Sequence, residues 1–159
     1  MKNIYIAEGA KLIDDVTLSK GCSVWYNAVI RADDGPVFLG ENTNIQDLVM
    51  IHSAAGFPVT TGKNVSVGHG AILHGCTIGS NVLIGMGAIV MDGAVINDNS
   101  VVGAGALVTQ GKEFPAGSLI IGSPARAVRQ LKEEDIEKIR ENALHYVRKA
   151  ERALQAGNR

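Results

Sequence analysis

Aliphatic residues recur at every sixth position along most of this chain. The spacing is unbroken over residues 6–30, resumes over 39–51, and returns over 67–108. A compact residue stands four places after most of these aliphatic positions, as Ala28 and Ala88 do. The aliphatic series comprises Ile6, Leu12, Leu18, Val24, Ile30, Leu39, Ile45, Ile51, Val67, Ile78, Ile84, Val90, Ile96, Val102 and Val108.

A strict six-residue period over such a length is typical of an all-β solenoid, a parallel β-helix built from hexapeptide repeats. Each rung is a short strand and a turn, and the aliphatic and compact residues stack inward on the next coil. A β-sandwich with short alternating strands is the alternative, but a sandwich does not require a constant six-residue phase. Glycine and asparagine accept a positive φ at low cost, and we expect this in the turns at Gly40, Asn42, Gly62, Asn64, Gly79 and Asn81.

The chain is expected to form a single domain over residues 1–159, with β-helix coils over 1–110 and an exit segment over 111–131. A C-terminal α-helix is predicted over 132–156, because apolar residues there fall on one stripe. The flank of the solenoid is the apolar surface available to this stripe, so we expect the helix to pack there. The stripe comprises Ile136, Ile139, Ala143, Tyr146, Val147, Ala150 and Leu154.

Composition narrows the classes of function. The net charge of −1 gives no electrostatic footprint for nucleic acid or for an anionic membrane surface. Two cysteines, Cys22 and Cys76, are too few for a disulfide framework, and both stand at the compact position of the repeat, where we expect buried thiols. The sequence contains no apolar leader and no apolar run of membrane-spanning length, so we expect a soluble cytoplasmic protein.

Three of the four histidines, His52, His69 and His74, lie inside the repeat, and His145 lies on the predicted helix. Three hexapeptides make one coil of about 18 residues, so rungs three steps apart are stacked. If residues 53–60 form a corner loop, the rungs of His52 and His74 are three steps apart and share one face on adjacent coils. His69 then lies on the preceding face, around a corner.

The repeat is one residue short in this region, since Val67 and Ile78 are eleven positions apart rather than twelve. If the missing residue falls after His74, then His52 and His74 both directly follow an inward aliphatic residue, and their side chains are parallel. Imidazoles are common zinc ligands, and a catalytic zinc keeps one position open for water. A three-histidine site would need His69 from a neighbouring chain, which a trimer with one site per interface provides. The alternative is that these histidines are unrelated surface residues.

Charged and amide side chains close to His52 in the repeat could orient the imidazoles or a metal-bound water. They are Arg31, Asp33, Gln46 and Asp47. For Arg31 and Asp33, a salt bridge between subunits with no chemical role is an equally good interpretation.

These motifs together resemble the γ-class carbonic anhydrases and their relatives among the bacterial hexapeptide-repeat proteins. The resemblance covers almost the whole chain, and its most specific part is the H-x4-H block of His69 and His74 with His52 upstream. The matching segments are VWYNAVIRADD (24–34), TNIQDLVMIH (43–52), VGHGAILHGCTIG (67–79), LIGMGAIVMDGA (83–94), VVGAGALV (101–108) and GSPARAVRQL (122–131).

The resemblance implies a left-handed parallel β-helix with a C-terminal helix, assembled as a homotrimer. It implies Zn²⁺, or alternatively Fe²⁺ or Co²⁺, held by His52 and His74 of one subunit and His69 of the next. In the family, an arginine–aspartate pair bridges subunits and a glutamine positions the metal-bound water. The positions that match the family's arginine, aspartate, asparagine and glutamine residues are Arg31, Asp33, Asn44, Gln46 and Asp47.

The activity implied is reversible hydration of CO₂ to bicarbonate, in which a metal-bound hydroxide attacks CO₂ at the trimer interfaces. The prototype enzyme of the family has an acidic loop whose glutamates shuttle protons, whereas DDGPV (33–37) and SAAGFPVT (53–60) contain no glutamate. Two alternatives remain open. One is a metal-binding trimer with weak or no turnover, and the other is an acyltransferase that uses acetyl-coenzyme A with a single histidine as general base.

Overall fold

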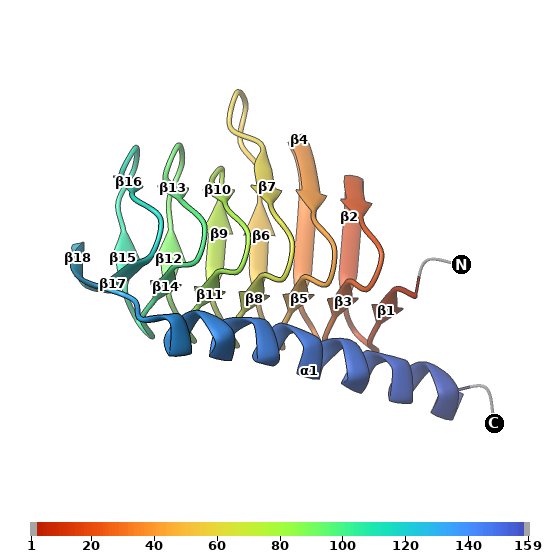
Figure 1. Ribbon diagram of the computed structural model, residues 1–159. Coiled ribbons are helices and arrows are strands. Elements are labelled where there is room, and N and C mark those ends of the chain that lie inside the picture. Colours follow the sequence, from red (N-terminus) through yellow and green to blue (C-terminus); the bar gives the residue numbers. More distant parts are fainter. Residues whose placement is uncertain (1–2, 158–159) are drawn as a thin grey trace.

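The chain winds into a parallel β-helix of about six turns in this computed structural model, which describes residues 3–157 (Figure 1). Successive coils pair residue against residue, as Tyr5 does with Ser23 and Leu83 with Val101. The fold class expected from the six-residue period is confirmed. The strands are β1 (Tyr5–Ile6), β2 (Lys11–Leu18), β3 (Ser23–Val24), β4 (Val29–Leu39), β5 (Asn44–Ile45), β6 (Met50–His52), β7 (Val59–Thr61), β8 (Ser66–Val67), β9 (Ile72–His74), β10 (Thr77–Ile78), β11 (Leu83–Ile84), β12 (Ile89–Val90), β13 (Val95–Ile96), β14 (Val101–Val102), β15 (Leu107–Val108), β16 (Glu113–Phe114), β17 (Ser118–Gly122) and β18 (Ala125–Gln130).

Two sheets form the walls of the solenoid. One follows the order β1-β3-β5-β8-β11-β14-β17-β18 and closes with the antiparallel pair β17 and β18. The other follows the order β15-β12-β9-β6-β4-β7-β10-β13-β16, with β2 paired to β4. Strand β4 pairs with β6 through residues 29–31 and with β7 through Val37 and Phe38. This second sheet therefore turns a corner along β4 and supplies two walls, and β6 and β9 lie side by side on one of them.

The aliphatic series forms the core of the solenoid, as its period predicts. Every member from Leu18 onward is buried, and Leu12 is partly buried against the same cluster. Ile6 is the exception at 49% exposure, because β1 is the edge strand of its sheet and is covered on one side only. Both cysteines are free and buried, which confirms their assignment to compact inward positions.

Asparagine and glycine have different functions in the turns. The Asn42 side-chain amide donates to Asn64 Oδ1 at 3.1 Å, and the ladder continues through the next coils. At Gly40 the next coil approaches so closely that a β-carbon would overlap the backbone of Gly62. Positive φ is confirmed at Asn42, Asn64 and Asn81, and the same prediction is wrong at Gly40, Gly62 and Gly79, where close packing between coils explains the glycine.

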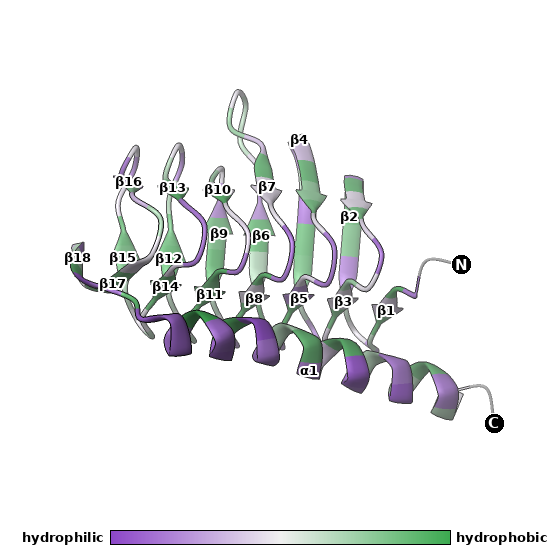
Figure 2. Cartoon of the chain, in the orientation of Figure 1, coloured by the Kyte–Doolittle hydropathy of each residue, from purple (hydrophilic) through white to green (hydrophobic). Residues whose placement is uncertain are grey.

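The helix α1 (Glu133–Gly157) runs along the first sheet and crosses several coils (Figure 1). Its apolar stripe faces the sheet, with Ile139, Ala143 and Ala150 buried, and its polar residues face outward (Figure 2). The Tyr146 ring lies 5.6 Å from the Trp25 ring on β3's flank, edge to face, which locks the helix against the early coils. The predicted packing of the helix on the solenoid flank is confirmed.

Residues 111–131, which were expected to form an exit segment, contain the strands β16 and β17 and the returning strand β18. Within residues 3–157, no helix combines the length and the apolar character needed to cross a membrane.

Candidate metal centre

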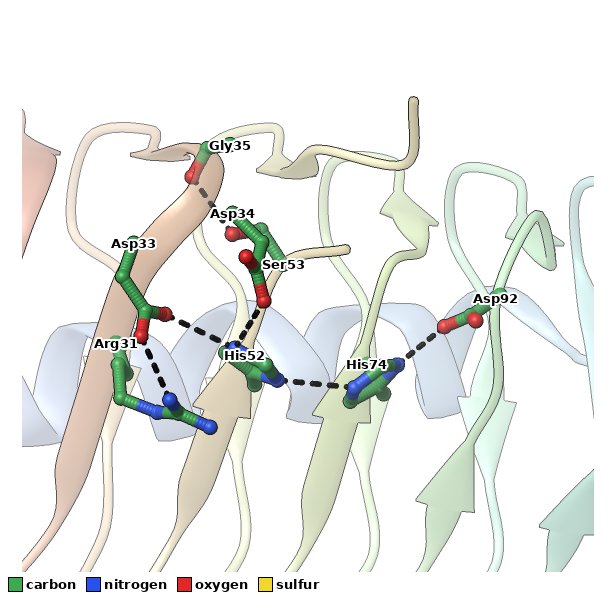
Figure 3. Close-up of polar contacts among 8 residues, drawn as sticks. All are labelled: Arg31, Asp33, Asp34, Gly35, His52, Ser53, His74 and Asp92. Atoms are coloured by element: carbon green, nitrogen blue, oxygen red, sulfur yellow. Dashed lines mark hydrogen bonds and ion pairs between the residues drawn. The ribbon is translucent and has the colours of Figure 1, made fainter. Parts of the chain in front are cut away.

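His52 and His74 form a pair at the ends of the adjacent strands β6 and β9. The two residues are direct partners in the parallel ladder, and Ile51 and Leu73 before them are both fully buried. His52 Nδ1 lies 3.0 Å from His74 Nε2 (Figure 3). The structure thus bears out the expectation that these histidines share a face on adjacent coils, while their rings are inclined to each other at 66° rather than parallel.

The inward residue of the His74 rung is Leu73, whereas Ile72 is 37% exposed. The single missing residue of the repeat therefore falls after His74, between Leu73 and Ile78. This placement keeps His74 directly behind an inward aliphatic residue, as the pairing of the histidines on one face requires.

Carboxylates hold the outer nitrogen of each ring. Asp33 Oδ1 lies 3.0 Å from His52 Nε2, and Asp34 Oδ2 lies 3.4 Å from the same nitrogen. On the other side of the pair, Asp92 Oδ1 contacts His74 Nδ1. The four groups form a continuous line, from Asp33 through His52 and His74 to Asp92, across four successive coils (Figure 3).

Arg31 extends this line at the Asp33 end. Arg31 Nη1 donates to Asp33 Oδ2 at 2.6 Å, and Arg31 opposes His52 in the ladder between β4 and β6. Desolvation acts to raise the pKa of Asp33, but the hydrogen bonds with His52 and Arg31 outweigh it and hold this pKa below its ordinary value. Asp33 is therefore a carboxylate that serves two cationic or donor partners at once. In the single chain, Arg31 and Asp33 pair with each other.

His69 lies elsewhere. It follows β8 on the first sheet, in the turn that leads to β9, and 48% of its side chain is exposed. Its Nδ1 lies 2.9 Å from Oδ2 of Asp47, which belongs to the equivalent turn of the preceding coil. Across residues 3–157, the one group of three ligand atoms within 4.8 Å of one another comprises Asp33, Asp34 and His52. The chain thus presents His69 separately from the other two histidines.

Gln46 lies beside His69, and Asn44 contacts Gln46. Gln46 and His69 line the same surface groove between the first sheet and α1, together with Tyr146. Gln46 Nε2 donates to Asn44 Oδ1 at 3.1 Å, and Asn44 Nδ2 donates to Ser66 Oγ at 2.8 Å. Both amides are buried, so this chain of hydrogen bonds fixes the orientation of Gln46.

A helix residue that the sequence interpretation missed completes this network. Asn142 Nδ2, on α1, donates to Ser66 Oγ at 2.9 Å, and Asn142 also lines the groove that contains Gln46. Asn142 occupies a polar position next to the apolar stripe, and a polar residue at that edge is ordinary in an amphipathic helix. Nothing in the sequence pattern distinguishes it.

The donor set fits a divalent transition metal. Two nitrogen ligands of one tetrahedral zinc ion are about 3.3 Å apart, close to the 3.0 Å between the inner nitrogens of His52 and His74. Histidines that bind metals commonly donate their other ring N–H to a carboxylate, and Asp33 and Asp92 stand in those positions. Neither cysteine belongs to the described cluster of ligand atoms, and burial raises the pKa of Cys22 to about 11 and that of Cys76 to about 12.

The coiled architecture defines a hexapeptide-repeat protein, and a family model described as bacterial transferase hexapeptide (six repeats) matches residues 75–110. Among curated proteins, a probable carbonic anhydrase of Methanocaldococcus jannaschii is 52% identical over 150 residues, which cover 94% of each chain. A carbonic anhydrase of Geobacillus kaustophilus is 39% identical, over 95% of this chain and 84% of its own. The chain belongs to the γ carbonic anhydrase family of hexapeptide-repeat proteins.

Two further relatives carry other names. Protein YrdA of Escherichia coli is 42% identical over 99% of this chain and 89% of its own. The crystal structure of a Bacillus cereus protein described as a candidate acetyltransferase superposes with a TM-score of 0.91 at 38% identity, over 94% of this chain and 87% of that one. The names of the relatives thus include both carbonic anhydrase and acetyltransferase, and the chemistry of the site has to separate these functions.

Proposed function

We propose that this protein catalyses the reversible hydration of CO₂ to bicarbonate at a metal centre held by His52, His74 and, from a neighbouring copy of the chain, His69. The observation that carries the proposal is the paired arrangement of His52 and His74. Their inner nitrogens face each other at 3.0 Å, and each outer nitrogen is engaged by a carboxylate. Such a pair is a bidentate ligand with its ring orientations already fixed.

The neighbouring copy is needed because His69 stands around the corner from this pair. A third imidazole would complete the three-ligand set of a catalytic zinc site, which leaves one position open for water. A homotrimer closes such contacts around a threefold axis and gives one site per interface. Each interface would then join the pair of one chain to the His69, Gln46 and Asn44 group of the next. Zn²⁺ is the metal that we propose, with Fe²⁺ and Co²⁺ as alternatives.

A bound divalent metal supplies hydroxide at neutral pH, because it lowers the pKa of a coordinated water towards about 7. The residues of the chain do the remaining work. Asp33 fixes the His52 ring, and Arg31 keeps that carboxylate ionised and in place. Gln46 Nε2 is committed to Asn44, which leaves the Gln46 carbonyl oxygen available to accept a hydrogen bond from a water in the groove beside His69. Asp47 holds His69 through Nδ1.

A metal-binding trimer with weak or no turnover is the second candidate. It is favoured by the two excursions beside the histidine pair, 33–37 and 53–60, which contain no glutamate to carry protons away. An acyltransferase is a weaker candidate, since one general base would not require two histidines with a carboxylate on each ring. The candidate acetyltransferase among the relatives is the observation that keeps this function in view.

Metal analysis and stopped-flow CO₂ hydration separate these functions. We expect about one metal per chain in the purified protein, hydration well above the buffer rate, and loss of both in His74→Ala. His145→Ala is the matched control, because His145 is exposed on α1 and distant in sequence from the repeat histidines. A metal-free wild-type protein with ordered histidines would rule out the proposal. If the wild-type protein contains metal but hydrates CO₂ no faster than His74→Ala, the result would favour the metal-binding trimer without turnover.

A further inference from the structure

The turn that follows His74 is shorter than the turn stacked on it. Strands β9 and β12 pair so that Val90 opposes Leu73. His74 and Gly75 alone lead from inward Leu73 to inward Cys76, whereas residues 91–93 lead from Val90 to the next inward residue. The coils pair again beyond the turn, where β10 meets β13. One residue of the longer turn therefore has no partner in the coil of His74.

Asp92 is at the centre of that longer turn, and its carboxylate reaches back to His74. Gly75 provides the space, since a β-carbon there would lie 2.6 Å from Asp92 Oδ1. The backbone of Gly75 has φ of +56°, which also favours glycine. The Gly93 N–H donates to the Gly75 carbonyl oxygen at 2.7 Å and fixes the two turns against each other. The deletion and the glycine thus allow contact between two side chains that a regular repeat would keep in separate rungs.

Phe57, from the 53–60 loop, packs against the turns that contain Gly75 and Gly93. A β-carbon at Gly75 would lie 2.8 Å from Phe57 Cβ, and one at Gly93 would lie 3.2 Å from Phe57 Cε1. Reciprocal backbone hydrogen bonds between Ala54 and Phe57, at 3.0 and 2.8 Å, hold this loop. Phe57 limits the access of water to the turns around Asp92, whose side chain is only 28% exposed, and a less hydrated carboxylate forms a stronger hydrogen bond.

We propose that Asp92 is a positioning residue for His74. Its carboxylate accepts the Nδ1–H of His74 and thereby selects the tautomer whose Nε2 lone pair points at the inner nitrogen of His52. Asp33 engages Nε2 of His52 on the other side of the pair, and in the metal-free chain the His74 Nε2 lone pair is oriented to accept from His52 Nδ1. The proposal rests on the proposed function for the purpose of this arrangement, which is to present two lone pairs to one metal, but the tautomer of His74 is a property of the metal-free chain.

The test measures the tautomer and the metal affinity separately. In ¹⁵N-labelled, metal-free protein we expect the His74 ring to carry its proton on Nδ1, and Asp92→Ala to remove that preference. Chelator competition with Zn²⁺ should show affinity reduced about 10- to 100-fold by Asp92→Ala and less by Asp92→Asn, which keeps an acceptor oxygen. Asp98→Asn is the matched control, because Asp98 lies in a similar turn but accepts from the Ser80 N–H at 2.7 Å.

The outcomes distinguish this proposal from the metal function. If Asp92→Ala keeps both the Nδ1–H tautomer and a zinc affinity within twofold of the wild type, the role of Asp92 is refuted. If wild-type protein binds no zinc, the proposed function fails, and the tautomer measurement alone decides: a preference lost in Asp92→Ala supports the positioning role, and an unchanged tautomer overturns it.

Discussion

If the protein forms the proposed homotrimer, trimers that mix two variant chains test whether the metal centre is shared between chains. A chain with His69→Ala keeps the pair of His52 and His74, and a chain with His74→Ala keeps His69. A trimer made of either chain alone lacks one ligand at every interface. In a mixed trimer, a complete site forms wherever the pair of a His69→Ala chain meets the His69 of a His74→Ala chain.

The expected recovery follows from the fact that the two halves of each site, the pair of His52 and His74 and the single His69, come from different chains. In an equimolar random mixture, each half of an interface is intact with a probability of about one half, so about one quarter of the interfaces are complete. After joint refolding, metal content and CO₂ hydration should therefore each recover to about a quarter of the wild-type value. The variants refolded apart and then mixed serve as the reference, and recovery in the jointly refolded sample should exceed theirs, because only joint refolding assembles the two kinds of chain together.

A second mixture supplies the matched control. His52→Ala and His74→Ala damage the same half of the site, so their mixture contains no chain with an intact pair and should not recover. Failure of the His69→Ala and His74→Ala mixture to recover, in trimers verified by their mass, would refute the shared centre. Equal recovery in both mixtures would refute it as well, since the assignment of ligands to the two halves would be wrong.

Three further predictions concern the fold and the turn. Ile96→Ala removes a fully buried side chain from the aliphatic core, where the stacked coils on either side prevent the cavity from closing. It should lower the free energy of unfolding, measured in urea, by about 3 kcal/mol. A loss below about 1 kcal/mol would contradict the tight packing of Ile96 in the core. Gly75→Ala should destabilise more than Gly87→Ala in the same assay and should weaken zinc binding, because both residues have positive φ but only Gly75 has Asp92 within 2.6 Å of the added carbon. Burial raises the pKa of Cys76 from 9.0 to about 12, so the thiol of the unfolded chain loses its proton at a lower pH than the thiol of the folded chain. The free energy of unfolding should therefore fall as pH rises above about 9, by up to about 1.4 kcal/mol per pH unit. A Cys76→Ala protein with an equally steep alkaline loss of stability would show that this thiol is not the cause.

Much of the fold is predictable from the sequence because a solenoid repeats one local rule. Stacked coils force equivalent residues to the same inward position, so an aliphatic residue at every sixth place already identifies the core. The purpose of individual glycines is not predictable in this way. Gly40 and Gly62 were expected to relieve backbone strain, but they make room for the adjacent coil, and that contact depends on how closely two turns stack.

The candidate site likewise contains features that the repeat predicts and features that depend on tertiary contacts. The rung count is sufficient to place His52 beside His74 and to separate His69, since it needs only the period and one loop. Gln46 was a candidate from its place in the repeat and Asn44 from the family resemblance, and the hydrogen-bond network that orients both includes Asn142 of the helix. Contacts between the helix and the sheet depend on the docking of α1, which the repeat does not encode.

Asp92 had a signal in the sequence, although it was not recognised as one. In a regular repeat, the side chains of a turn meet only their counterparts one coil away, so the coils behave as copies. A deletion in one coil leaves a residue of the next without a counterpart, and its side chain is free to reach across to a different position. The missing residue after His74 therefore predicts an unpaired residue in residues 91–93, and Asp92 is the only one of the three with a side chain that can hold an imidazole N–H. In this solenoid the three departures from the period, residues 31–38, the 53–60 loop and the shortened turn after His74, all lie beside the histidine pair. Chemistry that needs unlike side chains to converge requires a local break in a repeat that stacks like residues on one another.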